Sequence, residues 1–375
     1  MKSGNGMRMR VASAAAVCLT MVFVAFGARA QETKETVTVN DVDRTYTVRL
    51  PSGYNRAQKY PVVILLHGMN QDADDMERLT RFAELADKYG IIAVYPSALD
   101  GRWNVGVTPP AQQPMMRYPG GRHRGGGYPG GGGYPGGGYP GGGYPGGGSY
   151  PGGGQSGGQG RSEQASRRAP ADDIDFLNQM LDQMATKFSV DAARIYVTGL
   201  SEGGFMAMKV GCSMADRIAA IAPVGAAMPK AMICLPSRPV SVVMINGTSD
   251  PVVPHGGGTE HNLQLPVISV HDSAKAWASI DRCSEKPIQT KLPAHEKGGM
   301  EVKVETYNGC QQGTQVVSYN VKGGGNTWPG GEQYEVENQV GKTSQDLNAN
   351  QTIWSFLATQ RLPAKTGTDS GANPK

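Results

Sequence analysis

The sequence predicts an α/β protein built on a mostly parallel, doubly wound sheet. Short apolar segments with the length of buried strands alternate with segments whose apolar residues recur at helical spacing. One strand-turn-helix junction carries the pattern G-x-S-x-G, at 199–203. Together these features indicate parallel strands joined by helices, with the reactive side chains on loops at the carboxyl ends of the strands.

The expected elements follow from these patterns in chain order. Alternating apolar residues predict two antiparallel strands at 36–39 and 45–50. Continuous or short apolar runs predict the further strands 62–66, 91–95, 194–198, 218–224, 240–245, 302–307 and 316–321. Helical spacing predicts helices at 75–89, 172–188, 205–210, 273–279 and 346–358.

The stretch Arg194–Gly204 predicts a nucleophile elbow, in which a strand turns sharply into a helix around Ser201. The turn requires glycine two residues on either side of the serine, because a Cβ there would strike the neighbouring strand or helix. An ordinary Gly-flanked loop serine is the alternative, but the strand and helix around the motif favour the elbow. Ser201 is therefore the candidate nucleophile, at a helix N-terminus that favours developing negative charge.

Two rim loops supply candidate partners for this serine. The loop Leu66–Gln71 closes an early strand, and we expect the main-chain N–H groups of Met69 and Glu202 to form an oxyanion hole. We expect His67 to brace that loop rather than to catalyse. Asp250 follows a buried strand where the chain order Ser-Asp-His places the acid, although an Asp-Pro turn is the simpler alternative.

Residues 1–30 resemble a secretory signal peptide. A basic start precedes an apolar run, and Ala28-Arg29-Ala30 fits a cleavage site before Gln31. We therefore expect a secreted or periplasmic protein without a membrane anchor, because the apolar run is short for a spanning helix. Removal of the segment takes away four basic residues and no acidic ones, which leaves no excess charge to favour a nucleic-acid partner.

The four cysteines beyond the signal segment predict two disulfides in an exported protein. Pairing of nearest neighbours is one of three possible arrangements. A metal site is not expected, since no C-x-x-C or histidine spacing is present. No dinucleotide-binding loop occurs either, so we expect no cofactor. The cysteines are Cys212, Cys234, Cys283 and Cys310.

Residues 106–168 are expected to be a disordered insertion in a single hydrolase domain spanning 31–362, with a flexible tail at 363–375. The tetrapeptide Y-P-G-G recurs six times between Tyr118 and Tyr150. A segment so rich in glycine and without aliphatic residues after Met116 cannot bury enough surface to offset its ordering entropy. Because the insertion follows a predicted strand, it should leave from the rim of the site.

The chain resembles the polyhydroxybutyrate-depolymerase and feruloyl-esterase-like family of secreted α/β-hydrolases. The matching motifs cover nearly all of the chain outside the insertion and the signal segment. They are L-H-G at 66–68, R-W-N at 102–104, D-D-I-D-F-L at 172–177, V-T-G-L-S-E-G-G at 197–204, I-A-P-V-G at 221–225, G-T-S-D-P-V-V-P at 247–254 and G-G-G-N-T-W-P-G at 323–330.

The resemblance implies a Ser/Asp/His esterase acting on a small or polymeric ester, with Ser201 and Asp250 in the first two roles. It implies that Trp103 and Trp328 flank the substrate pocket. It also implies the disulfides Cys212–Cys234 and Cys283–Cys310, which agrees with nearest-neighbour pairing.

The chain departs from the family at the position of the catalytic base. The family's last motif is G-G-G-H-T-W-P-G, and Asn326 stands in place of its histidine. A carboxamide cannot accept the serine proton near neutral pH. His255, five residues after Asp250, is the best substitute base, although a surface or substrate-contacting role is the alternative. Two hypotheses follow: an exported ester hydrolase that is impaired or uses another base, and an inactive pseudo-hydrolase that binds ligands or surfaces.

Overall fold

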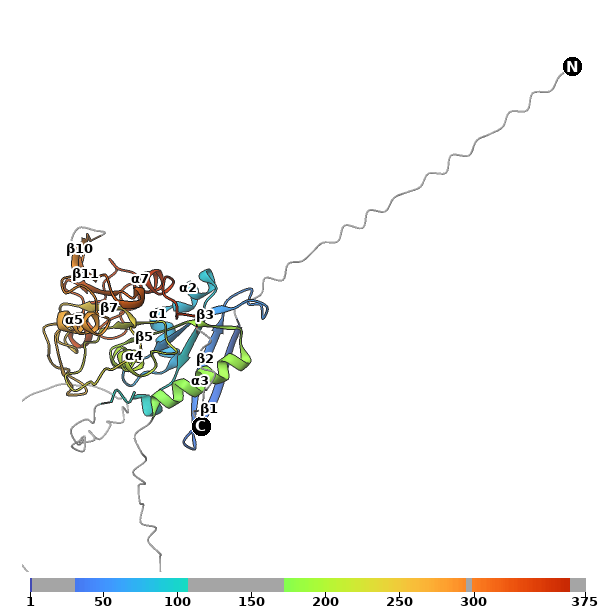
Figure 1. The fold of residues 1–375 in the computed structure, drawn as a ribbon, viewed down its shortest axis with the longest axis horizontal. Coiled ribbons are helices and arrows are strands. Elements are labelled where there is room, and N and C mark those ends of the chain that lie inside the picture. The colour runs from blue at the N-terminus through green and yellow to red at the C-terminus, as the bar shows by residue number, and fades with distance from the viewer. Residues whose placement is uncertain (2–30, 107–171, 295–298, 365–375) are drawn as a thin grey trace, which may run out of the picture. The chain divides into compact units, whose positions relative to one another are not determined.

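The structure, a computed structural model, describes residues 1, 31–106, 172–294 and 299–364. A single ten-stranded sheet runs through the described part in the order β1-β2-β4-β3-β5-β6-β7-β12-β11-β10 (Figure 1). Its strands are β1 Gln31–Val39, β2 Val42–Leu50, β3 Tyr60–Leu66, β4 Ile92–Pro96, β5 Val190–Leu200, β6 Ala220–Val224, β7 Ser241–Gly247, β10 Ile288–Leu292, β11 Val302–Tyr307 and β12 Val316–Val321. A two-stranded hairpin joins β8 Gly258–Thr259 to β9 Pro266–Val267.

The six central strands from β4 to β12 are mutually parallel, and both ends of the sheet are antiparallel. The predicted α/β-hydrolase fold is confirmed. Parallel strands that are apolar throughout must be covered on both faces, and the two faces of β3 show this. Val62, Ile64 and Leu66 face one core, whereas Val63 and Leu65 face the other.

Helices cover each face of the sheet. The core of one face receives side chains from α3 Asp173–Lys187, α4 Glu202–Ser213 and α5 Val270–Ile280. The core of the other receives them from α1 Ala73–Thr80, α2 Phe82–Tyr89 and α7 Ala349–Leu357. The short elements are α6 Glu337–Val340 and the 3-10 turns η1 Leu99–Gly101 and η2 Gln311–Gly313. The arrangement is doubly wound.

Side-chain caps fix where four of these helices begin. Asp72, Asp172, Ser269 and Asn348 each accept a hydrogen bond from a backbone N–H of the first turn of α1, α3, α5 and α7, respectively. Such caps stabilise a helix by about 1 kcal/mol each. The final helix accordingly begins at Ala349, three residues later than its apolar pattern predicts.

The prediction of a single helix at 75–89 is wrong, because the structure has two helices there, α1 and α2. Arg81 adopts the left-handed conformation, with φ of 49°, and ends α1 while starting α2. The apolar spacing continues across this residue, so periodicity alone cannot reveal the break. The cap turns the chain so that Met76 and Leu79 on α1 and Phe82 and Ala86 on α2 reach the same core.

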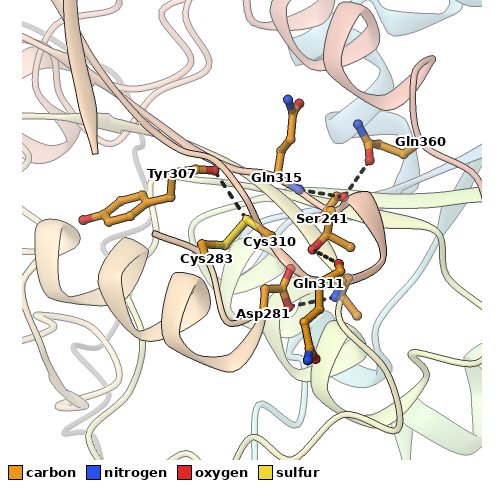
Figure 2. The surroundings of a disulfide bond; sticks show 10 residues. Ser241, Asp281, Cys283, Tyr307, Cys310, Gln311, Gln315 and Gln360 are labelled. Carbon is orange, nitrogen blue, oxygen red and sulfur yellow. Dashed lines mark hydrogen bonds between the residues drawn. A yellow bond between two sulfur atoms is a disulfide. The ribbon is translucent and has the colours of Figure 1, made fainter. Parts of the chain in front are cut away.

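Two disulfides have the expected pairing, Cys212–Cys234 and Cys283–Cys310. The second joins the end of α5 to the turn after β11, next to a buried polar cluster (Figure 2). In that cluster Asp281 Oδ1 accepts the Val240 N–H, and Ser241 Oγ donates to Gln360. Each disulfide closes a loop of a size that contributes about 3 kcal/mol through the unfolded state.

The predicted signal segment, the insertion apart from Gly106, and the end of the tail lie outside the described residues. Within the described ranges, no helix has both the length and the apolar character needed to cross a membrane. In the same ranges, no group of three or more His, Cys, Asp or Glu side chains is arranged to hold a metal ion.

Candidate active site

Ser201 sits at the sharp turn between β5 and α4. Its φ of 57° and ψ of −114° are rare for a residue with a side chain, and holding them costs on the order of 1–3 kcal/mol. The turn is closed by glycine contacts: a Cβ on Gly203 would lie 2.1 Å from Leu66 O, and one on Gly199 would lie 2.5 Å from Gly203. Only glycine fits at either position, which explains the spacing of G-x-S-x-G.

The loop after β3 lines the same cavity as this serine. Among the described residues, the backbone N–H groups of Gly68 and Asn70 in this loop are engaged in hydrogen bonds, and that of Met69 is not. Gly68 N–H donates to Gln71 Oε1, and Asn70 N–H donates to Gly101 O. Met69 lies between them, and its backbone N–H is not part of these turn contacts. Met69 and Ser201 line the same cavity. The Met69 N–H is therefore not engaged by the turn contacts that flank it beside the cavity.

His67 braces that loop from within the core. Its Nδ1 donates to Gly68 O at 2.7 Å, and its Nε2 accepts the Ala98 N–H at 3.0 Å. These partners require the neutral ring with its hydrogen on Nδ1. Burial lowers the pKa of His67, which also favours the neutral ring. Trp103 Nε1 donates to His67 O, which ties the R-W-N loop to the same place.

The R-W-N loop is itself fixed by a buried ion pair. Asp173, at the start of α3, receives hydrogen bonds from Arg44 and from the Asn104 N–H, both at 2.6 Å. The Asp173 carboxylate is fully buried, and Lys209 of α4 donates to Asn104 O. The D-D-I-D-F-L and R-W-N motifs therefore meet in one contact that positions the wall beside α4.

Asp250 lies in the turn after β7 and is 8% exposed. Its Oδ1 accepts the backbone N–H groups of Val252 and Val253, and its Oδ2 accepts Asn326 Nδ2 at 2.8 Å. Burial raises the pKa of Asp250 to about 6, although these three hydrogen bonds oppose the shift. These contacts fit both interpretations of Asp250. Its carboxylate accepts hydrogen bonds from the turn that it begins, and it also accepts one from Asn326.

Asn326 is fully buried and its orientation is fixed by its partners. Nδ2 donates to Asp250 Oδ2 and to Gly225 O at 3.0 Å, so both of its hydrogens are engaged. The backbone N–H donates to Val340 O, and the backbone carbonyl accepts the Tyr334 hydroxyl. Oδ1 is buried and has no hydrogen-bond partner in the structure. A flipped amide would set Oδ1 against a carboxylate and a carbonyl, so Oδ1 is the atom left to meet a donor.

Glu202, directly after the serine, is 2% exposed and its side chain is directed to Arg102. Arg102 Nε donates to Oε1 at 3.1 Å. Burial raises the pKa of Glu202 to about 7 against the opposing influence of Arg102, and the nearby Glu260 carboxylate adds to the rise. The carboxylate next to the nucleophile therefore titrates near neutral pH.

A cavity of about 630 Å³ brings the predicted groups together. It combines the serine, the Met69 loop and Asn326 with a wall rich in carboxamides. None of the described residues that line it is Lys or Arg. The described lining is Gly68, Met69, Asn70, Gln71, Ser201, Pro251, Val252, His261, Asn262, Asn326, Tyr334, Glu335, Asn338, Gln339 and Val340.

Five predicted site residues are not among the described residues that line the cavity: Asp250 and Glu202, whose contacts are given above, and His255, Trp103 and Trp328. His255 Nε2 is hydrogen-bonded to Asn320 Oδ1 at 2.7 Å, and His255 is not among the described lining residues. Trp103 and Trp328 are 3% and 0% exposed and do not line the cavity either. Trp328 Nε1 donates to Asn350 Oδ1, as Trp103 donates to His67 O. Both indoles brace neighbouring loops.

Sequence reasoning missed two residues of the cavity. His261 and Tyr334 line it, yet no motif contains either of them. His261 lies between the strands of the β8–β9 hairpin, 11 residues after Asp250. It is one of the six histidines of the sequence, but its local sequence assigns it no role. Tyr334 follows the G-G-G-N-T-W-P-G motif and gave no signal of its own.

Comparison with known proteins agrees with this architecture. Residues 44–102 match the family described as "Esterase PHB depolymerase". The protein named "Putative esterase NocK" from Nocardia uniformis subsp. tsuyamanensis is 24% identical over 79% of this chain and 74% of its own length. Feruloyl esterase B of Piromyces equi is 32% identical over 44% of this chain. The matched part of this chain spans 32% of that protein's length.

Among solved structures, an acetyl xylan esterase from Aspergillus awamori aligns with a TM-score of 0.48 and 12% identity, covering 87% of this chain and 99% of that one. The family match and the sequence relatives carry the assignment. The chain is thus similar to esterases of the polyhydroxybutyrate-depolymerase and feruloyl-esterase-like family of α/β-hydrolases.

Proposed function

We propose that this protein is an exported serine hydrolase of carboxylic esters that works through an acyl-enzyme on Ser201. The observation that carries the proposal is the elbow itself. Ser201 is held at a positive φ by glycines that admit no side chain, and it lines a cavity together with Met69 and Asn326. Strain of this kind persists at sites where it serves a function.

In the proposed reaction Ser201 Oγ attacks the ester carbonyl carbon, and the carbonyl oxygen gains negative charge. The backbone N–H groups of Met69 and Glu202 stabilise that oxyanion, aided by the N-terminus of α4. Asp250 is the buried carboxylate that orients and polarises the group at position 326. With Asn326 at that position, no proton acceptor stands between Asp250 and Ser201, so we expect turnover well below that of a complete triad.

The cavity wall supports a polar ester as the substrate. Its carboxamides offer paired donors and acceptors that suit hydroxyl and carbonyl groups, and the absence of Lys and Arg from its described lining disfavours anionic substrates. Relatives named as feruloyl esterases and as an acetylxylan esterase act on esters of this polar kind. We therefore propose a small or polymeric ester with a hydroxyl-bearing alcohol part.

The second candidate function is that of a pseudo-hydrolase, which binds a ligand in the same cavity without turning it over. One observation favours it: Asn326 satisfies Asp250 and Gly225 through both Nδ2 hydrogens, so the position is stable without an imidazole. In this case the cavity binds an ester or a hydroxyl-bearing surface, and Ser201 retains its strained geometry only as a contact.

Labelling with a fluorophosphonate probe, together with turnover of p-nitrophenyl acetate and butyrate, distinguishes the two functions. An esterase is labelled on Ser201 and shows slow turnover that Ser201→Ala removes. A folded protein that is neither labelled nor active, but whose melting temperature rises with added ester, is the binding protein instead. The melting curve of Ser201→Ala serves as the folding control.

The proposed export has a separate test. Expression of the full chain in a bacterial host, followed by N-terminal sequencing of the protein from the periplasm or the medium, should return a sequence that starts at Gln31. Recovery of an unprocessed chain from the cytoplasm would contradict the signal-peptide prediction.

A further inference from the structure

The described residues contain four histidines, and three of them are committed to other contacts. His67 is buried, with both ring nitrogens bonded to the backbone. His255 is bonded through Nε2 to Asn320. His271 is paired with Glu305 through Nδ1 at 3.0 Å. They are placed as structural or surface groups.

His261 is the remaining described imidazole, and it lines the cavity that Ser201 lines. Its ring makes no hydrogen bond with any described residue, whereas its backbone N–H donates to Val252 O. That bond holds the residue at the rim beside the Asp250 turn and leaves the ring free to turn. A glycine run precedes it: nothing lies within 4 Å of the Cβ position of Gly256, and Gly257 and Gly258 have φ of 81° and 144°.

Asn326 lines the same cavity and provides the complementary feature. Its Oδ1 is a buried acceptor without a partner. Leaving such an acceptor unpaired costs about 1–3 kcal/mol, so a donor is favoured there. An imidazole N–H from His261 is a donor of this kind that the chain itself can bring to the cavity.

We propose that His261 is the general base of this enzyme and that Asn326 is its positioning residue. Asn326 Oδ1 accepts one ring N–H of His261, and Asp250 polarises Asn326 through Nδ2. The other ring nitrogen then faces Ser201. The arrangement rests on the proposed esterase function and replaces the missing histidine at position 326 with an imidazole from the β8–β9 hairpin.

The charges around the cavity suit an imidazolium. Glu260, next to His261 in the chain, is 2% exposed and accepts the backbone N–H groups of Asn262 and Leu263. Asp250 lies beyond Asn326, and Glu335 and Tyr334 are on the cavity wall. Arg102 is engaged by Glu202. The surrounding carboxylates therefore stabilise the positive charge that forms when His261 takes a proton.

The proton transfers balance in both half-reactions. As Ser201 Oγ bonds to the carbonyl carbon, its proton passes to His261, and the imidazolium returns it to the leaving alkoxide when the C–O bond breaks. A water molecule then gives its proton to His261 and attacks the acyl carbon. Release of the acid returns that proton to Ser201 Oγ, so ester and water give acid and alcohol.

The test is the turnover of p-nitrophenyl butyrate by His261→Ala, with His271→Ala as the matched control because His271 lies on α5 and pairs with Glu305. General-base catalysis contributes about 10²–10⁴ in rate, so His261→Ala should lower kcat at least 10²-fold. It should also remove the low-pH limb of the kcat profile. His271→Ala should leave both unchanged.

The role of Asn326 is tested by a double-mutant cycle with Asn326→Leu. If Asn326 acts through His261, Asn326→Leu lowers kcat with little change in KM, and it has little further effect when His261 is already alanine. Melting curves confirm that each variant folds. Additive losses in the cycle would overturn the positioning role.

Two outcomes overturn the inference without touching the proposed function. The first is a wild-type protein that is labelled on Ser201 and turns over ester while His261→Ala retains full activity. The second is a loss of activity in His255→Ala alone. In either case the esterase stands and the base lies elsewhere.

Discussion

Asn326 Nδ2 donates to Asp250 Oδ2 at 2.8 Å, so the carboxylate keeps the partner it would have in a serine triad although the partner is an amide. An imidazole at position 326 would make the same contact through one ring nitrogen and turn the other toward the cavity. In the proposed triad, Asn326 would thus stand where a histidine could make the same contact.

Asn326→His should raise ester turnover by about 10² or more. In a comparable hydrolase, loss of the histidine costs about 10⁶, and full recovery is not expected because neighbouring contacts fit an amide. The measurement is kcat on p-nitrophenyl butyrate. Adding Ser201→Ala should abolish the gain, and adding His261→Ala should cost little, since position 326 then supplies the base. A folded, inert Asn326→His variant would refute the triad frame.

Glu202→Gln should increase turnover at pH 8 and have a small effect at pH 6. Burial raises the pKa of Glu202 to about 7, so at pH 8 a buried negative charge lies beside the developing oxyanion. Glutamine keeps an oxygen for Arg102 and removes that charge. The ratio of variant to wild-type kcat across pH 6–8 measures the effect. A ratio that does not change with pH would show that the carboxylate is too far from the oxyanion to matter.

Gly203→Ala should prevent folding or destabilise the protein by more than about 3 kcal/mol. Its Cβ would lie 2.1 Å from Leu66 O and 2.6 Å from His67 O, both of which are backbone atoms that cannot move aside. Gly256→Ala is the matched control, because nothing lies within 4 Å of its Cβ position and its φ is not in the left-handed region. Urea denaturation compares the two variants, and equal midpoints would contradict the close approach.

Asp281→Asn should flatten the pH dependence of stability. Burial raises the pKa of Asp281 from 3.8 to about 6, although hydrogen bonds with Thr314 and the Val240 N–H and the charge of Arg238 oppose the shift. Between those values the folded protein holds a proton that the unfolded chain has released. The free energy of unfolding therefore falls as pH rises from about 4 to 6, by on the order of 2 kcal/mol.

Asparagine keeps the acceptor for the Val240 N–H and has no charge to lose. The variant should therefore match the wild type at pH 4 and exceed it in stability at pH 8. Urea midpoints at the two values provide the check, and a variant less stable than wild type at pH 8 would show that the carboxylate is favourably solvated.

The parallel core and the elbow could be predicted because each rests on local pattern. Val62–Leu66 is apolar at every position, and the G-x-S-x-G spacing around Ser201 is itself a local pattern, although its glycines also pack against the end of β3. The strand β10, with the sequence Ile288-Gln-Thr-Lys-Leu292, is exposed along its whole length and carries no alternating signal. This segment is a strand because β11 pairs with it, and its own residues do not reveal that pairing.

The site residues divide in the same way. The roles of Ser201 and Asp250 could be predicted because each residue lies in a short motif of consecutive residues. The contacts of His255 with Asn320 and of Trp328 with Asn350 depend on segments 65 and 22 residues away, so neither position could be assigned from its own loop. The presence of His261 in the cavity likewise depends on the path of the β8–β9 hairpin relative to α6, which no local pattern encodes.

The residues after α7 are anchored at the amino ends of the central strands. Gln360 O accepts the Tyr196 hydroxyl, Gln360 Oε1 accepts Ser241 Oγ, and Leu362 N–H donates to Ala193 O. Ala193 and Ser241 belong to the starts of β5 and β7, whereas Ser201 and Asp250 follow the ends of the same strands. A support attached just beyond residue 364 would therefore hold the protein on the side away from the proposed site. Immobilisation through this point presents the cavity to a solid or polymeric substrate, which makes it the natural site for a surface tether.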